Sequence, residues 1–199
     1  MSYRKVIIAI LYILCAGCST MGKIEISNEA QGGIKRYTLR QHHIAEERMP
    51  GFWSPNYRAL ITYSRTSVSA KTEPVPVLFQ IRACQECAPL AATAVLTVND
   101  KDYILPLEEI TTSDKSDAYT QSHFKSGGGG TVDYSKPTGS TTTTTFYRIL
   151  KARTVIPADL KPELQSAQGV TYTFHSGDNA ITIKLSESEL MTLKELLHY

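Results

Sequence analysis

The sequence predicts an α+β domain of mainly antiparallel β structure, a sheet or a sandwich with one C-terminal helix packed on it. Three observations support this class. Most segments alternate apolar and polar residues, which is typical of half-buried strands. Turn-forming residues separate these segments at short intervals. Only the last segment, residues 186–199, repeats its leucines with a helical period.

Residues 1–17 have the build of an export signal. Arg4 and Lys5 form a positive start, and the apolar run VIIAILYIL follows at residues 6–14. A membrane-spanning helix needs about 20 apolar residues, and this run is much shorter. We therefore predict a signal peptide that is removed from the mature chain.

The end of this signal carries a small pair, Ala16 and Gly17, directly before Cys18. The arrangement resembles the lipobox of bacterial lipoproteins, although Cys15 stands where that family usually has Leu. The resemblance implies that Cys18 is lipidated and that the mature chain is anchored to a membrane. By the same resemblance, Ser19 in place of Asp implies the periplasmic face of the outer membrane. An ordinary signal peptide that happens to precede a Cys is the alternative.

The mature chain is expected to be formally neutral. The full chain has 21 basic and 19 acidic side chains, and Arg4 and Lys5 leave with the signal. Such a balance is unlike the basic surface of a nucleic-acid-binding protein, so no nucleic acid is expected as a partner. We predict a lipidated tether at residues 18–33 and one globular domain at residues 34–199. An edge strand at residues 23–27 is the alternative for part of the tether.

The first half of the domain reads as strands joined by loops. Residues 34–44 and 57–69 are rich in Thr, Tyr and Ile and are predicted strands. The loop between them contains two prolines, a glycine, Phe52 and Trp53. These two aromatic residues are candidate partner contacts. In the alternative, the loop folds them onto the edge of the core.

The next segments predict a β-meander. Residues 75–82 form an apolar strand, and residues 93–98 and 103–107 flank the turn sequence Asn99-Asp100-Lys101-Asp102. Cys84 and Cys87 lie between these strands and are the only cysteines left after removal of the signal and lipidation of Cys18. In an oxidising periplasm they are expected to form a disulfide with each other.

The same cysteine pair offers an alternative function. A strand, Cys84-x-x-Cys87 and then Ala88-Pro89 superficially resemble a thioredoxin active site. The resemblance implies a thiol–disulfide protein in which Cys84 is the attacking thiolate. The β-branched residues that follow soon after Cys87 argue against the long helix of that family, and acidic Glu86 would raise the pKa of a neighbouring thiol. We therefore favour a structural disulfide. Zinc is disfavoured, since two thiolates are half of a tetrahedral set.

Residues 113–140 differ from the rest in composition. They are dominated by Ser, Gly, Asp, Lys and Thr, with four consecutive glycines at residues 127–130. Such a segment buries little apolar surface, so we predict a flexible surface loop, with a short strand at residues 118–124 as the alternative. The threonine tract at residues 141–145 then leads into a predicted long strand, because β-branched side chains favour a pleated surface.

The C-terminal part gives the clearest local predictions. Residues 157–168 contain two prolines and at most one short helical turn. Residues 170–174 and 181–185 alternate around a turn at residues 176–179 and predict a hairpin. Ser186 and Glu189 form a capping box that starts a helix. Leu190, Leu193 and Leu197 lie on one face of that helix, which we expect to pack on the sheet.

No motif for catalysis, phosphate binding or metal binding stands out. His42 and His43 are adjacent on a predicted strand and therefore point to opposite faces, so they cannot chelate together. We predict a non-catalytic lipoprotein without a cofactor or metal. Its expected partners are the membrane, through the lipid, and an unknown envelope protein, with the chain acting as an assembly accessory or as an inhibitor of a periplasmic enzyme.

Overall fold

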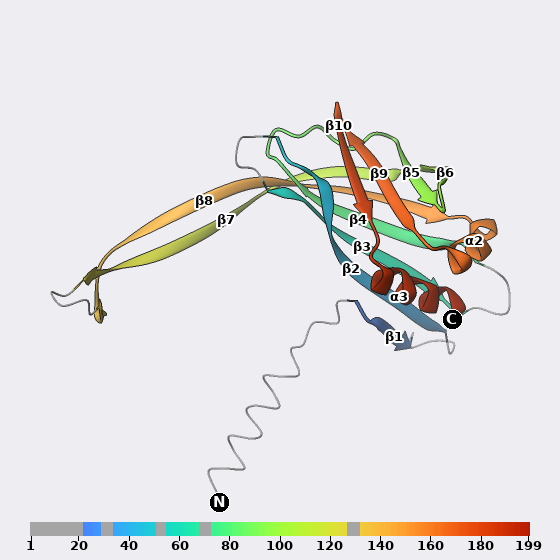
Figure 1. The fold of residues 1–199 in the computed structure, drawn as a ribbon, viewed down its shortest axis with the longest axis horizontal. Helices are drawn as coiled ribbons and strands as arrows, with labels where there is room; N and C mark the ends of the chain where they lie inside the picture. The colour runs from blue at the N-terminus through green and yellow to red at the C-terminus, as the bar shows by residue number, and fades with distance from the viewer. Residues whose placement is uncertain (1–21, 29–33, 51–54, 68–72, 127–131) are drawn as a thin grey trace, which may run out of the picture.

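A computed structural model describes residues 22–28, 34–50, 55–67, 73–126 and 132–199 of the chain, with the backbone alone at residues 125, 126 and 132–138. Ten strands, two short helices and one 3-10 turn make up this part (Figure 1). The strands are β1 (Ile24–Asn28), β2 (Lys35–Arg48), β3 (Asn56–Thr66), β4 (Val75–Ala83), β5 (Thr93–Val98), β6 (Lys101–Pro106), β7 (Glu108–Ser126), β8 (Val132–Ile156), β9 (Val170–Ser176) and β10 (Asn179–Lys184). The helical elements are η1 (Ala158–Leu160), α2 (Lys161–Ser166) and α3 (Glu187–His198).

The strands form two antiparallel sheets. A curled six-stranded sheet has the order β1-β2-β3-β4-β8-β7, and a four-stranded sheet has the order β10-β9-β5-β6. Every strand pair is antiparallel. The mainly antiparallel β class and the C-terminal helix are therefore confirmed. The predicted β-meander is wrong, because β4 belongs to the six-stranded sheet whereas β5 and β6 belong to the four-stranded sheet.

The hydrophobic core lies between the two sheets. Phe79 of β4 contacts Tyr172 and Phe174 of β9, with ring centroids 5.3 and 4.8 Å apart. All three rings are fully buried, and burial of an aromatic side chain of this size is worth about 1.5–3 kcal/mol. Alternation along β3 and β4 also buries Tyr57, Tyr63 and Ile81, whereas the residues between the buried positions of these strands are partly or fully exposed. The sequence alternation thus becomes one buried and one solvent-facing side of the larger sheet.

Two predicted hairpins are present, and the turn of the first is shorter than predicted because β6 begins at Lys101. Val98 pairs with Lys101, and both turn residues between them, Asn99 and Asp100, have positive φ angles of 47° and 65°. Two consecutive positive φ angles define the turn type that matches the twist of a hairpin. Ser176 pairs with Asn179 in the second hairpin, around Gly177 and Asp178.

Helix α3 begins and packs as its sequence indicates. The Ser186 side chain accepts a hydrogen bond from the backbone N–H of Glu189, and the Glu189 carboxylate accepts one from the N–H of Ser186. One side of the helix is buried by Leu190, Leu193, Leu196 and Leu197. At its end, the Arg65 guanidinium of β3 donates to the carbonyl oxygen of Leu197 at 2.5 Å. The helix therefore covers one side of the sheet and is fixed at both ends.

The predicted tether needs a correction. Within residues 18–33, the segment Ile24–Asn28 forms β1, an edge strand paired with residues 35–39 of β2. Ile24 is partly buried against the core. Backbone pairing with β2 thus holds a segment whose polar composition suggested a free linker, and the edge-strand alternative describes it better.

Candidate functional site

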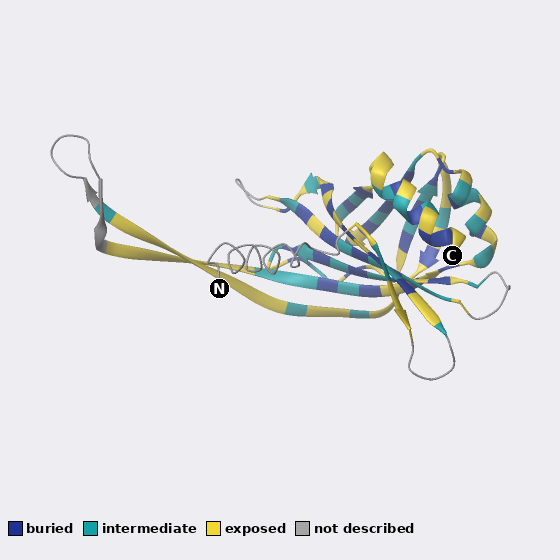
Figure 2. Cartoon of the chain, turned by 90° about the horizontal axis from the view of Figure 1, so that it is seen from below, coloured by how far each residue is buried: buried dark blue, intermediate teal, exposed yellow. Residues whose placement is uncertain are grey.

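The most distinctive feature of the molecule is a β-hairpin arm. It consists of the parts of β7 and β8 that extend past the larger sheet, from the pair Lys115 and Tyr147 to the pair Ser126 and Val132. Figures 1 and 2 show it projecting far from the body that contains both sheets. About 12 residues of β7 lie in it, which corresponds to a length of about 40 Å.

This arm corrects the prediction of a flexible loop at residues 113–140. Residues 108–126 and 132–156 instead form two continuous paired strands, apart from residues 127–131, which lie outside the described ranges. The root of the hairpin explains why. Asp114 of β7 pairs with Arg148 of β8, and the same Arg148 pairs with Ala83 of β4 inside the larger sheet. The body fixes the register there, and the strands continue from it without burying apolar surface.

The two faces of the arm differ in charge. Residues 116, 118, 120 and 122 and their partners 146, 144, 142 and 140 share one face, which consists of Ser, Thr, Ala and Phe. The charged or titratable side chains Lys115, Asp117 and His123 lie on the other face. Nearly all of these residues are exposed, including Tyr119 at 69 % and Phe146 at 59 %. One face of the arm is thus uncharged and consists mostly of small side chains, and the other face carries the charged ones.

The arm also has two open backbone edges. Among the described residues, β7 and β8 pair only with each other along this stretch. Natural proteins usually protect such edges with lysine, proline or bulges. Residues 116–122 and 140–146 contain neither lysine nor proline, and no register shift interrupts their pairing. The arm is therefore available for pairing with another strand.

The predicted disulfide is present at the root of the arm. Cys84 and Cys87 are bonded, with their Cα atoms 5.1 Å apart, in the turn that follows β4. Cys87 is buried, and Cys84 is partly exposed. The bond closes a tight turn at the place where β4 ends and β8 continues outward, paired with β7.

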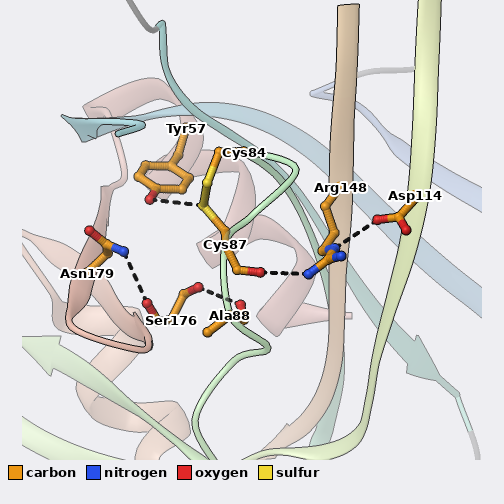
Figure 3. The surroundings of a disulfide bond; sticks show 8 residues. All are labelled: Tyr57, Cys84, Cys87, Ala88, Asp114, Arg148, Ser176 and Asn179. Carbon is orange, nitrogen blue, oxygen red and sulfur yellow. Dashed lines mark hydrogen bonds and ion pairs between the residues drawn. A yellow bond between two sulfur atoms is a disulfide. The ribbon is translucent and has the colours of Figure 1, made fainter. Parts of the chain in front are cut away.

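The disulfide turn joins three parts of the structure (Figure 3). The Arg148 guanidinium of β8 donates to the carbonyl oxygen of Cys87 at 2.9 Å and to the Asp114 carboxylate of β7 at 2.8 Å. The Tyr57 hydroxyl of β3 lies 3.6 Å from the Cys87 sulfur. On the side of the second sheet, the Ser176 hydroxyl of β9 donates to the carbonyl oxygen of Ala88 at 2.5 Å. This network positions the arm on the body.

The surroundings of the disulfide differ from those of a thioredoxin site. In place of a helix that begins at Cys84, a turn and irregular backbone lead from Cys84 to β5. In the described part of the chain, no helix therefore begins at Cys84 to lower the pKa of its thiol. A thioredoxin-like fold would also place a loop proline beside the cysteines, and Pro157 is the candidate for it. Pro157 instead lies beyond the far end of β8, since Ile156 pairs with Val75 at the start of β4. These positions favour a structural role for the bond.

A second polar cluster is buried between β2 and α3. His43 Nδ1 lies 3.2 Å from a carboxylate oxygen of Glu189, and Gln41 donates to the Glu189 carbonyl oxygen at 2.8 Å. Both side chains point into the core, whereas His42 points outward, as the alternation predicts. His43 Nε2 and Gln41 Oε1 have no hydrogen-bond partner in the described part of the chain. The cluster holds α3 onto the sheet.

The remaining predicted site residues lie elsewhere. Cys18, Phe52 and Trp53 fall outside the described residues, so lipidation and the aromatic contact stay predictions. Within the described ranges, no group of three or more His, Cys, Asp or Glu side chains is arranged to hold a metal ion. In the same ranges, no helix has the length and apolar content that crossing a membrane requires.

Sequence reasoning missed the arm, although one signal was present. The threonine tract at residues 141–145 predicts a strand, and a strand needs a partner along its length. The preceding polar segment is the nearest one in sequence, and in the structure Tyr119 and Gln121 pair with Thr143 and Thr141.

Comparison of the chain with protein-family models, curated proteins and solved structures finds no match.

Proposed function

We propose that this chain is a lipoprotein, anchored through Cys18 on the periplasmic face of the outer membrane, that acts through protein contacts made by the β7–β8 arm. The α+β sandwich is the body that carries this arm. The role is non-catalytic, either in the assembly of an envelope complex or in the inhibition of a periplasmic enzyme.

One observation carries the proposal, namely that the arm is a long hairpin exposed on both faces and open at both edges. A two-stranded ribbon is marginally stable in water without further packing. The arm is therefore a poor structural element by itself and a good template for another strand. The lipobox resemblance at Cys18 supports a location where such a partner is an envelope protein.

The proposal is tested by placing a photo-crosslinking amino acid at Tyr119 of the full-length protein in its own cells. Ile104 on β6 serves as the matched position, because it is 75 % exposed and Tyr119 is 69 % exposed. We expect a defined crosslinked species from position 119 and none of that size from position 104. Equal products from both positions, or none from either, would overturn the proposal.

A variant with a shortened hairpin provides a second test. Asp114 and Arg148 are register partners, so residues 115–147 can be replaced by an Asn-Gly turn without changing the body. We expect this variant to fold and to stay on the membrane. If the shortened variant restores the phenotype of a deletion strain as fully as the full-length protein does, the arm is not the contact element.

A further inference from the structure

A pocket lies where the arm leaves the body. It has a volume of about 280 Å³. The start of β3, the end of β4, the beginning of the disulfide turn and residues 145–147 of β8 surround it. Ligand pockets begin at about 300 Å³, so this one has room for a single terminal residue rather than for a larger molecule. Met49 and Phe146 supply apolar walls.

Two arginines line this pocket. Arg58 of β3 and Arg82 of β4 are direct cross-strand partners, and both point to the outer face of the sheet. Like charges in directly opposed positions repel each other across a strand pair. The fold keeps these two arginine residues directly opposite each other, and an anion bound between their side chains would reduce the repulsion.

Only one carboxylate forms an ion pair with these arginines in the described part of the chain. Asp117 of the arm lies 2.9 Å from Arg82 Nη1, and the Arg82 guanidinium rests 3.6 Å above the centre of the Tyr147 ring. One contact leaves other N–H donors of Arg82 available. Arg58 forms no ion pair with any described residue. The pocket therefore has an excess of one positive charge and unused donors.

An open strand edge runs into the same pocket. Pairing between β4 and β8 ends at Ala83 and Arg148, and β8 continues through Tyr147, Phe146 and Thr145 with β7 as its only neighbour. The backbone groups on the β4 side of these three residues have no strand partner among the described residues. An extended segment can continue the line of β4 along this edge and place its end at the arginines.

We propose that this pocket binds the C-terminal carboxylate of an extended peptide segment of a partner protein. Guanidinium groups of Arg58 and Arg82 take the carboxylate, since such charge-assisted pairs are short and strong. The edge of β8 pairs with the preceding residues, and the apolar walls take the last side chain. This inference rests on the proposed function, because it names the chemistry of a partner.

The test uses the full lipidated protein in detergent and two synthetic probes. The probes are N-acetyl-Thr-Val-Thr-Val-Phe with a free carboxylate and the same peptide as its C-terminal amide, both dye-labelled for fluorescence anisotropy. We expect the free acid to bind about tenfold or more tightly than the amide, which corresponds to the loss of one charge-assisted contact. Equal affinity for acid and amide, or no binding of either, would overturn the inference.

Variants identify the residues. Arg58→Gln and Arg82→Gln should each weaken the acid about tenfold, and Asp117→Asn should strengthen it because it removes the competing carboxylate. Arg153→Gln is the matched control, since Arg153 lies on the same strand as the pocket's β8 wall and pairs with Glu109 at 2.9 Å. An equal loss in Arg153→Gln, or displacement of the acid by an equal concentration of inorganic phosphate, would show nonspecific anion binding and overturn the site.

The two proposals fail separately. If the peptide acid does not bind while position 119 still crosslinks in cells, the arm remains the contact element and the carboxylate site is wrong. If the peptide acid binds and the arm shows no crosslink, the pocket stands as a binding site and the role of the arm is wrong.

Discussion

His43 Nδ1 lies 3.2 Å from a carboxylate oxygen of Glu189, which joins the buried face of β2 to the first turn of α3. Burial lowers the pKa of His43 below the value of about 6.5 of an exposed histidine, and the charge of neighbouring His42 acts in the same direction. The Glu189 carboxylate opposes both effects without reversing them. The folded protein thus favours the neutral imidazole.

This pair predicts a pH dependence of stability. Below about pH 6.5 the unfolded chain takes up a proton at His43 before the folded chain does, so the free energy of unfolding decreases as the pH falls toward the folded pKa. Above the pKa of the unfolded chain, the free energy of unfolding does not depend on the protonation of His43. Urea denaturation between pH 5 and pH 8 measures the effect. His43→Gln should remove that part of the decrease, and His175→Gln, at an exposed position, should keep it. Identical pH profiles for the wild type and His43→Gln would contradict the prediction.

The disulfide is predicted to be structural. Its loop is short, so the chain-entropy estimate for Cys84→Ser with Cys87→Ser is a loss of about 2 kcal/mol in the free energy of unfolding. A larger loss would show that the turn itself rearranges and gives up its contacts with Arg148 and Tyr57. Chemical denaturation of the oxidised protein and the double variant measures the difference.

A redox titration of the same pair separates the two roles. A structural bond should have a reduction potential below about −300 mV, whereas a value near −200 mV, together with an unchanged stability of the double variant, would favour the thiol–disulfide function.

The anchor predicts a release experiment. Cys18→Ala removes the sulfur that the lipobox resemblance assigns to the lipid, so the protein should no longer incorporate labelled palmitate and should leave the membrane fraction. Cys15→Ala is the matched control within the signal and should retain the label. Labelling of the Cys18→Ala variant would show that the lipid is attached elsewhere or that the signal is of another kind.

The start of α3 predicts a moderate effect on stability. Ser186→Ala removes the side-chain acceptor for the Glu189 N–H and should lower the free energy of unfolding by about 1 kcal/mol. Thr192 lies in the same helix, where its hydroxyl donates to the carbonyl oxygen of Ser188, and Thr192→Ala should change stability far less. Thermal unfolding of both variants, followed by circular dichroism, gives the comparison. A loss in Thr192→Ala that equals the loss in Ser186→Ala would contradict the capping role.

Several elements were predictable from short stretches of sequence. The turns at Asn99-Asp100 and Gly177-Asp178 and the cap at Ser186 depend on a few neighbouring residues, and all three are present in the structure. The alternation that buries Tyr57 and Phe79 is equally local. For the same reason the opposite orientations of His42 and His43 followed from their adjacency on one strand.

The sequence by itself therefore determined most strands of the body, their hairpin turns, the closing helix and the disulfide pair, because each depends on residues close together in the chain. The tertiary structure decided the arm and the arginine pocket. Residues 113–126 carry too little apolar surface to form a strand alone. They form one in the folded protein because Asp114 is held opposite Arg148 at the edge of the sheet. Arg58 and Arg82 lie far apart in sequence, and only the register of β3 and β4 places them opposite each other. Register between distant strands is set by the packing of the whole core, which no single segment encodes.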